Sequence, residues 1–213
     1  MIRSLASRAS LTRLAVGLAA ASLVLGAAGT SEAQIKRPGA HPRYDFELEP
    51  HLLLQWTRAW GDEGIGVGAR ANIPLFHNGP IDSINNNMAV GFGLDWVHFD
   101  DICNYWWRWY AGPRPNVDCS ADVFWAPVVL QWNFWLTDMI SVFGEPGLAI
   151  EHARWDYEFR CGPGGAELCR YKDSDTDLEF VFFAGARFMF GDTVGMTVRL
   201  GTPYISLGVN FLL

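Results

Sequence analysis

The feature that most constrains the fold of this chain is an alternation of apolar and non-apolar residues along most of its length. In GIGVGARANIP, residues 64–74, every second residue is apolar, and the positions between hold glycines, Arg70 and Asn72. Successive side chains of a β-strand point to opposite faces, so this stretch predicts a strand with one oily face and one face of glycine and polar groups. No long segment shows the 3.6-residue apolar stripe of an amphipathic helix, which favours an all-β fold.

The same alternation predicts eight strands after residue 43. We expect them at residues 44–57, 64–75, 88–99, 121–136, 139–158, 177–190, 193–201 and 203–213. The links after the fourth and sixth strands are short, whereas the links after the third and fifth strands are long and hold all four cysteines. Because links alternate between the two ends of a meander, the long links share one end. An even strand count with short turns at one end and long loops at the other is typical of outer-membrane barrels.

The composition of the non-oily face indicates which side of the strands meets lipid. That face holds mostly glycines with isolated charges, whereas a soluble, lipocalin-like barrel would cover its outer face with lysine, glutamate, serine and threonine. The chain has only two lysines, Lys36 and Lys172, but ten tryptophans and fourteen phenylalanines. We therefore expect the oily face to point outward into a membrane. A soluble periplasmic ligand-binding barrel is the alternative.

The organisation of residues 44–213 resembles the small eight-stranded outer-membrane barrels, such as the membrane domain of outer membrane protein A. The terminal stretch YISLGVNFLL resembles the C-terminal signal of that family, but it ends on Leu213 instead of an aromatic residue, with Phe211 two places back. The resemblance lies in architecture and not in a diagnostic motif. It implies an eight-stranded antiparallel up-and-down transmembrane β-barrel in a bacterial outer membrane.

The N-terminal segment has the organisation of a secretory signal peptide that is cleaved on export. Three arginines precede the apolar run LAVGLAAASLVLGAA at residues 14–28, and small residues follow it near position 33. The apolar run is shorter than the ~20 residues that a membrane-spanning helix needs, which disfavours the alternative of a membrane anchor. We expect a signal peptide at 1–33, an extended lead-in at 34–43 and the barrel domain at 44–213.

The four cysteines fall as two local pairs in turn-rich segments. They are Cys103, Cys119, Cys161 and Cys169. An exported chain enters an oxidising compartment, where such pairs close as disulfides. Zinc binding is the alternative, but the CxxC spacing typical of structural zinc sites is absent. We therefore expect two disulfide-tied loops at the long-loop end.

Charged residues fall at inward positions of the predicted strands. They are Glu49, His51, Arg70, Asp95, Glu145, Glu151, Glu179, Arg187 and Arg199. Eight strands enclose a space that side chains can fill, and charges inside it must pair because desolvating an unpaired charge is costly. We predict a salt-bridge network that plugs the lumen, with Arg70 and Arg187 near Glu49 or Glu145 at its centre. A path for protons or ions is the alternative.

The sequence predicts no catalytic residues. Some barrels of the family it resembles are lipid-modifying enzymes with a serine and a histidine two residues apart on a lipid-facing strand, and no His-x-Ser pattern occurs here. His98 and His152 fall on the outward face near the loop end, but neither has a serine at that spacing. No G-x-S-x-G nucleophile elbow is present either. A lipid-active outer-membrane enzyme therefore remains only an alternative function.

Two predicted loop segments carry side chains suited to binding. KDSDTD, residues 172–177, places Asp173, Asp175 and Asp177 at alternate positions, but Leu178 stands where a calcium loop needs glycine. We expect a solvated acidic loop there, with a weak divalent site as the alternative. NYWWRWY, residues 104–110, either offers aromatic and arginine binding anchors or belongs to the outer aromatic belt. Its contact residues would be Tyr105, Trp106, Trp107, Arg108, Trp109 and Tyr110.

The charge of the chain limits its partners. A net charge of −7 and the lack of a basic cluster disfavour nucleic acid. We predict no cofactor and no metal. The expected function is that of a non-enzymatic outer-membrane barrel with a filled polar lumen, in a structural or surface-contact role. Its expected partners are outer-membrane lipid and, at loops 100–120 and 159–176, lipopolysaccharide or another surface partner.

Overall fold

The computed structural model describes residues 34–56, 63–100, 102, 117–161, 163 and 167–213. The predicted signal peptide at 1–33 lies outside the described residues, so it stays a prediction. Among the residues that are described, no helix is long and apolar enough to cross a membrane.

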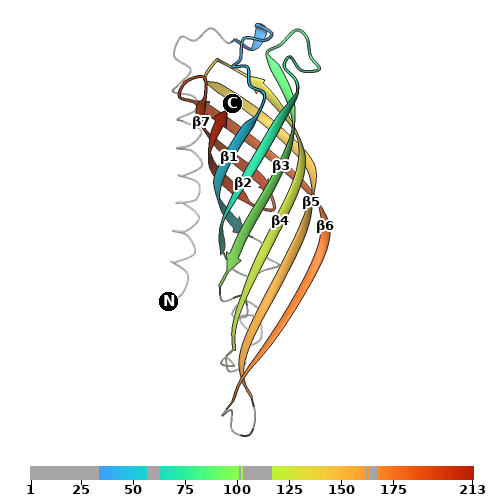
Figure 1. The fold of residues 1–213 in the computed structure, drawn as a ribbon, viewed down its shortest axis with the longest axis vertical. Helices are drawn as coiled ribbons and strands as arrows, with labels where there is room; N and C mark the ends of the chain where they lie inside the picture. The colour runs from blue at the N-terminus through green and yellow to red at the C-terminus, as the bar shows by residue number, and fades with distance from the viewer. Residues whose placement is uncertain (1–33, 57–62, 101, 103–116, 162, 164–166) are drawn as a thin grey trace, which may run out of the picture. The chain divides into compact units, whose positions relative to one another are not determined.

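The described residues contain eight strands, which follow a short 3-10 helix, η1, at Gln34–Lys36. The strands are β1 (Glu47–Trp56), β2 (Glu63–Phe76), β3 (Asn86–Phe99), β4 (Val117–Trp135), β5 (Ile140–Cys161), β6 (Glu167–Met189), β7 (Val194–Thr202) and β8 (Ile205–Leu212). Each strand pairs antiparallel with the next, and β1 also pairs with β8, so the sheet closes into a barrel (Figure 1). The predicted eight-stranded antiparallel up-and-down barrel is confirmed.

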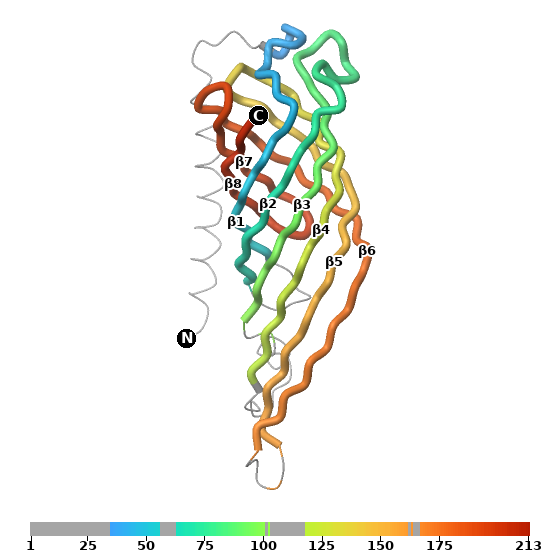
Figure 2. Tube along the Cα trace, viewed as in Figure 1, coloured from blue at the N-terminus to red at the C-terminus, as the bar shows by residue number. Residues whose placement is uncertain are grey.

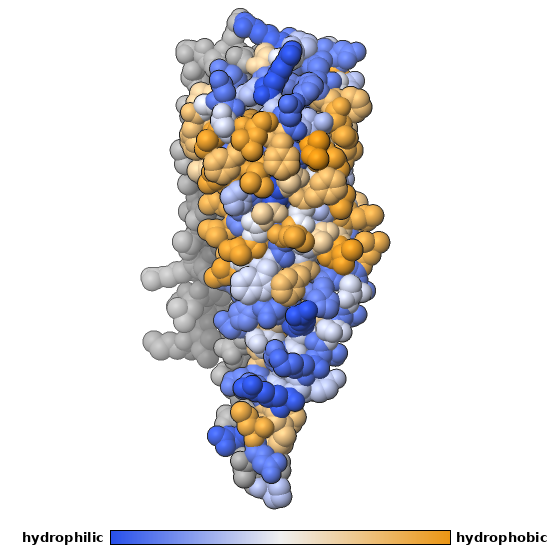
Figure 3. All heavy atoms as spheres, viewed as in Figure 1, coloured by the Kyte–Doolittle hydropathy of each residue, from blue (hydrophilic) through white to orange (hydrophobic). Residues whose placement is uncertain are grey.

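The barrel carries its apolar residues on the outside. Leu94 is 73% exposed and Leu178 is 68% exposed, whereas Arg70 is 1% exposed and Arg187 is fully buried. A soluble barrel would show the opposite distribution, so the inside-out arrangement expected for a transmembrane barrel holds. We call the exposed apolar residues on the outward faces of the eight strands the apolar belt, and Figure 3 shows an apolar band on one side of the molecule. Its members include Leu52, Val67, Ile73, Phe92, Leu94, Val128, Leu148, Ile150, Leu178, Phe180, Phe182, Leu200, Leu207 and Val209.

Three neighbouring strands are much longer than the others. β5 has 22 residues and β6 has 23, whereas β7 has 9 and β8 has 8. A strand needs about 9–11 residues to cross the hydrocarbon layer, so β7 and β8 have about one membrane thickness and β5 and β6 about twice that length. Figure 2 shows β4, β5 and β6 continuing together past the ends of the other strands. We call this extension, residues 117–123, 151–161 and 167–177, the outer ribbon.

The outer ribbon corrects one sequence-based boundary. β6 was expected to start at residue 177, but it starts at Glu167, and residues 167–177 pair along their whole length with β5. The predicted acidic loop KDSDTD is therefore part of a strand. Aspartate has a low strand propensity, which made the segment read as a loop, but pairing with a complete neighbouring strand outweighs that local preference.

The interior of the barrel is filled in three layers. We call the end of the barrel with the short β4–β5 and β6–β7 turns the tight-turn end. The layer at this end is an apolar cluster of Tyr44, Trp135, Met189 and Leu212. The middle layer is polar, as described below. The layer nearest the outer ribbon is a second apolar cluster, which includes Leu53, Val97, Phe99, Val123, Trp125, Phe183 and Tyr204. The lumen was expected to be polar and filled, and the structure adds that large inward residues such as Trp125 and Phe183 occupy its outer part.

Candidate functional site

The middle layer of the lumen is a network of ionisable side chains from six strands, which we call the lumen network. Its members are Glu47, Glu49 and His51 on β1, Arg70 on β2, Asp95 on β3, Glu145 on β5, Arg187 on β6 and Arg199 on β7. All of them are 5% exposed or less. The alternation of each strand turns these residues inward, and closure of the barrel brings them to a common axis.

Arg199 lies at the centre of the lumen network. Its Nε donates to Glu145 Oε2 at 2.9 Å, and its Nη2 donates to Glu49 Oε2 at 2.9 Å. Nη1 of Arg199 also donates to Glu49. Glu145 accepts a further hydrogen bond from Arg70 Nη1 at 2.6 Å. The guanidinium plane of Arg199 therefore bridges two carboxylates with the forked geometry that makes arginine suitable for buried pairing.

His51 links the network to β3. Its Nε2 lies 2.8 Å from Asp95 Oδ1, and its Nδ1 lies 3.2 Å from the backbone carbonyl oxygen of Glu49. Both partners offer acceptor oxygens, so the His51 ring joins β1 to β3 through the Asp95 carboxylate. The lumen network thus sets four carboxylates against three arginines and His51.

Arg187 is held by fewer polar contacts than Arg199. Its Nη2 lies 2.5 Å from Glu47 Oε1 and 3.4 Å from Gln131 Oε1, and its cation lies 5.9 Å from the ring centroids of both Trp135 and Phe143. Among the described residues, its Nε and Nη1 have no hydrogen-bond partner. Aromatic faces attract a guanidinium, so two rings replace part of the missing hydrogen bonding.

The sequence-based prediction and the structure overlap at the axis but differ in two respects. The structure brings together Glu49, His51, Arg70, Asp95, Glu145, Arg187 and Arg199, all of them predicted inward residues. Glu47 was missed, although it shares the period-two register of Glu49 and His51 on the same strand. Glu151 and Glu179 were included but lie beyond the network towards the outer ribbon, and no ion pair joins them to the described residues of the network.

The glycines of residues 64–74 allow the network to pack. A Cβ on Gly68 would collide with the Asp95 carboxylate and with Nε2 of His51. Gly68 lies directly opposite both residues in the strand register. The glycine face of β2 is therefore the inner face, and at this position it makes room for a buried hydrogen bond.

The tight-turn end of the lumen is closed by the lead-in segment before β1. The ring of His41 stacks on Trp135 with centroids 5.6 Å apart, and its Nδ1 lies 2.6 Å from Asn85 Oδ1. The backbone N–H of Asn85 donates to the carbonyl oxygen of Ile35. Burial lowers the pKa of His41, which favours a neutral ring against the indole. The lead-in segment thus covers the lumen at this end.

The inward face of the outer ribbon carries several carboxylates that form no ion pair with the residues that the structure describes. Glu151 lies opposite Asp177, and Asp175 and Asp173 follow on the same face of β6. Burial, the largest cause, and the nearby charges of Glu179, Asp177 and Asp175 together raise the pKa of Glu151 to about 7. Among the described residues, no group of three or more carboxylate, histidine or cysteine side chains is arranged to hold a metal ion.

The free edge of β6 in the outer ribbon is capped by its own aspartates. Within the described strands, residues 167–181 of β6 pair only with β5, because β7 pairs only with residues 182–189. The backbone N–H of Ser174 donates to Asp173 Oδ1 at 2.9 Å, and that of Thr176 donates to Asp175 Oδ1 at 2.8 Å. These side chains occupy donors that an edge strand otherwise offers to another strand.

The two outward histidines lie at the outer edge of the apolar belt. His98 Nδ1 lies 2.8 Å from Asp122 Oδ1, and this hydrogen bond raises the pKa of His98. His152 Nδ1 lies 2.7 Å from the hydroxyl of Thr176, and Arg154 Nε donates to His152 Nε2 at 3.1 Å. Because Nε2 accepts, Nδ1 is the protonated nitrogen and donates to the threonine. His152 therefore cannot act in this arrangement as the base that activates the hydroxyl.

The cysteine and aromatic predictions fall partly outside the described residues. Cys161 and Cys169 form a disulfide across the end of β5 and β6. Cys119 is buried, but Cys103 lies outside the described residues, so the second disulfide stays a prediction. The predicted contact residues at 105–110 also lie outside them.

Comparisons with known proteins give structural neighbours but no sequence relatives. No protein-family model matches the sequence, and no curated protein sequence matches it. Ail, the attachment invasion locus protein of Yersinia pestis, is similar in structure with a TM-score of 0.43 and 11% identity over 78% of this chain and 96% of that one. Neisserial surface protein A follows with a TM-score of 0.40 and 12% identity over 79% and 97% of the chains.

A third solved structure is the N-terminal β-barrel domain of Pseudomonas aeruginosa OprF. Its TM-score is 0.34, with 11% identity over 80% of this chain and 98% of that one. The chain described here has the fold of the small eight-stranded barrels that its sequence resembles, a conclusion that rests on its own closed barrel and exposed apolar belt.

Proposed function

We propose that this chain is exported and inserted into a bacterial outer membrane as a closed, non-enzymatic barrel that presents the outer ribbon and its loops as a contact surface. The observation that carries the proposal is the buried, ion-paired lumen network between two apolar layers. A filled eight-stranded lumen leaves no continuous aqueous path, so the barrel acts through its outside surfaces and not as a pore.

Single-channel recording in a planar bilayer tests the closed lumen. We expect the wild-type protein to show no steady conducting level. Arg187→Ala removes one side chain of the middle layer but leaves both apolar layers, so it should produce brief openings at most. A wild-type barrel with a stable open level would overturn the closed-lumen proposal and favour the ion-path alternative.

Fractionation tests location and closure together. We expect the protein in the outer-membrane fraction, with the N-terminus of the mature chain at Gln34 and with different gel mobility before and after boiling. Recovery of the chain in the periplasmic extract would support the soluble alternative. The exposed apolar belt argues against that alternative, because water-exposed surfaces seldom carry such large apolar areas.

The inward face of the outer ribbon supports a contact role. Trp155 and Tyr157 pack at the edge of the outer apolar cluster, and the rings of Tyr157 and Tyr171 lie 6.0 Å apart. Tyrosine and tryptophan are enriched at binding surfaces because they offer large rigid contact areas with one polar atom. The disulfide between Cys161 and Cys169 ties the end of this ribbon and limits its movement.

The lipid-active enzyme is the weaker candidate. Its best constellation in the described residues is His152 with Thr176, and the hydrogen bond from Arg154 fixes the histidine in the tautomer that donates to the hydroxyl. A nucleophile needs a base that accepts its proton. Release of fatty acid from purified lipopolysaccharide by the wild-type protein, abolished in His152→Ala, would reverse this judgement.

A further inference from the structure

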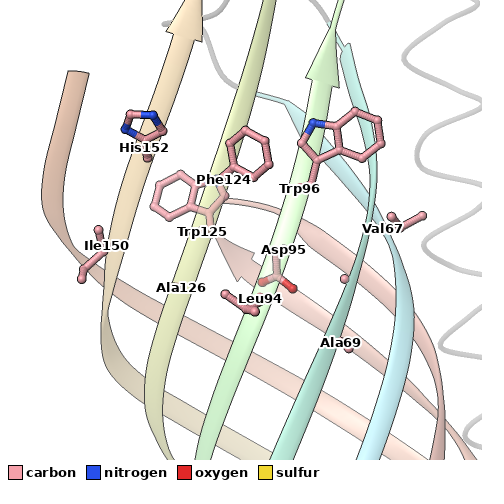
Figure 4. Close-up of a pocket in the computed structure, with 11 residues that line it drawn as sticks. Val67, Ala69, Leu94, Asp95, Trp96, Phe124, Trp125, Ala126, Ile150 and His152 are labelled. Atoms are coloured by element: carbon pink, nitrogen blue, oxygen red, sulfur yellow. The ribbon is translucent and has the colours of Figure 1, made fainter. Parts of the chain in front are cut away.

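A hollow indents the lipid-facing wall of the barrel at the outer edge of the apolar belt. Its volume is about 460 Å³, and Ala126 on β4 lies among larger neighbours from β3 to β5 (Figure 4). Leu94, Trp96, Phe124 and Ile150 border it. Because the strand register places small alanines among large outward side chains, the wall is recessed here.

The register orders the residues around the hollow by their distance from the tight-turn end. Trp96, Phe124 and His152 lie side by side in one row across three strands. Ala126 and Ile150 lie side by side one outward position closer to the tight-turn end. Asp122 and Arg154 lie side by side one outward position farther from the tight-turn end, within the outer ribbon. The hollow is therefore apolar and bordered by an aromatic row, and the two charged residues Asp122 and Arg154 lie just beyond that row.

Arg154 bends back towards the hollow instead of extending away from the belt. Its guanidinium carbon lies 5.6 Å from the ring centroid of Phe124, and its Nε donates to His152 Nε2 at 3.1 Å. Both contacts are with the aromatic row that borders the hollow. The side chain is exposed, so its terminal nitrogens face the surroundings of the barrel.

Arg154 has no carboxylate partner among the described residues, although Asp122 is its direct neighbour across the strands. Asp122 Oδ1 is instead bound by His98 Nδ1 at 2.8 Å and by Trp96 Nε1 at 2.9 Å. The two terminal nitrogens of Arg154 therefore keep their hydrogen-bond donors. A cation with free forked donors beside an apolar hollow is complementary to a molecule that joins a phosphate to acyl chains.

We propose that the hollow and Arg154 together form a binding site for the lipid A part of lipopolysaccharide. One acyl chain lies over Ala126 between Leu94 and Ile150, and a phosphate group accepts hydrogen bonds from the terminal nitrogens of Arg154. His98 and Trp96 are positioning residues that hold Asp122 away from the cation. The inference rests on the proposed outer-membrane location, in which the outer ribbon points away from the cell.

The chemistry favours this lipid over a phospholipid. A phosphate monoester carries about −1.5 to −2 charges at pH 7, more than the single charge of a phosphodiester, so it pairs more strongly with a guanidinium.

Titration of the full-length mature chain in detergent micelles tests the site. Dissociation constants for lipid A, phosphatidylglycerol and phosphatidylcholine would be measured by native mass spectrometry. We expect lipid A to bind about ten-fold more tightly than either phospholipid. Arg154→Ala should weaken lipid A binding about ten-fold through loss of charge-assisted hydrogen bonds, and Ala126→Phe should weaken it similarly because the new ring fills the hollow.

Lys172→Ala is the matched control. Lys172 is an exposed cation on the outward face of the same ribbon, but it pairs with Asp156 at 3.0 Å. We expect this variant to keep lipid A affinity within about two-fold. Heat-modifiable gel mobility checks that each variant is a folded barrel. Because Arg154 and Lys172 are exposed, we expect both alanine variants to fold.

Each other outcome overturns the inference. Unchanged lipid A affinity in both Arg154→Ala and Ala126→Phe would exclude the site, and equal effects of Lys172→Ala would reduce it to general charge attraction. Tight Arg154-dependent binding of phosphatidylglycerol would reject lipid A as the occupant. None of these results touches the proposed closed barrel, whose failure would appear as conductance or as periplasmic location.

Discussion

Glu145 and Glu151 lie on the same face of β5, yet their surroundings are opposite. Glu145 is buried between Arg70 and Arg199 and also accepts from Gln131. Glu151 is half-buried among carboxylates, with no ion pair to the described residues. The comparison shows that the burial of a carboxylate, and not its face on the strand, decides whether it needs a cation as partner. At the axis each unmatched charge is costly, whereas beside the ribbon water tolerates an excess of one sign.

The largest effect should follow from removing the central cation of the matched group. Arg199→Leu leaves Glu49 and Glu145 without their shared partner, so we expect the free energy of unfolding to fall by about 3–5 kcal/mol. Urea unfolding in detergent micelles or lipid vesicles measures it. Arg170→Leu is the control, because Arg170 pairs with Glu158 on the exposed face and should lose less than about 1 kcal/mol. Equal losses in the two variants would contradict the comparison.

A smaller loss is expected for the other axial arginine. Arg187 bonds Glu47 through one nitrogen and leaves two of its nitrogens without a partner in the described structure. Arg187→Leu should therefore destabilise the barrel by about 3 kcal/mol or less, the lower end of the range for breaking a buried pair. The same unfolding measurement ranks the two variants. A greater loss for Arg187→Leu than for Arg199→Leu would show that hydrogen-bond number does not govern the network.

The carboxylates around Glu151 should make the stability of the protein depend on pH. Because the folded-state pKa of Glu151 is about 7 and its ordinary value is 4.5, the folded protein binds this proton more tightly than the unfolded chain. Its contribution to stability is complete below pH 4.5 and is lost as the pH rises through 7. Glu151→Gln should reduce the fall in melting temperature between these pH values. If the melting temperatures of the variant and the wild type depend on pH identically, Glu151 does not cause the pH dependence.

The smallest effect concerns the neighbours that raise this pKa. Asp177→Asn removes one of the like charges beside Glu151 and should lower its pKa by a fraction of a unit, since burial is the leading cause. Carbon-13 NMR of the labelled glutamate carboxyl group measures the change. Asp156→Asn on the opposite face of the ribbon should leave the pKa of Glu151 where it is.

The sequence predicts which residues point inward, but it does not predict the position of each residue along the barrel axis. A period of two assigns Arg70, Glu145 and Arg199 to the interior from local sequence alone. Which of them meet depends on how far neighbouring strands are shifted, and that shift is set by closure of the barrel. Arg199 was therefore treated as one charge among many, although it proves to be the central cation.

Two further misses have separate physical causes. The start of β6 was placed too late because Asp173 and Asp175 oppose strand formation locally, while the ladder with β5 supplies the compensating pairing. Trp125 could be assigned to the inward face from the period of two, but its clustering with Phe183 from β6 in a separate apolar layer depends on barrel closure and could not be predicted locally. A closed barrel can fill its axis with rings as well as with ion pairs.

The aspartates that cap the free edge of β6 have a consequence for crowding. A protein that is densely packed in a membrane meets many copies of itself, and a long unpaired edge strand could form backbone hydrogen bonds with the same strand of another copy. Asp173 and Asp175 occupy the donors of the next residues and place like charges where a second copy would approach. The capped edge therefore disfavours pairing between the long ribbon and a strand of a second copy.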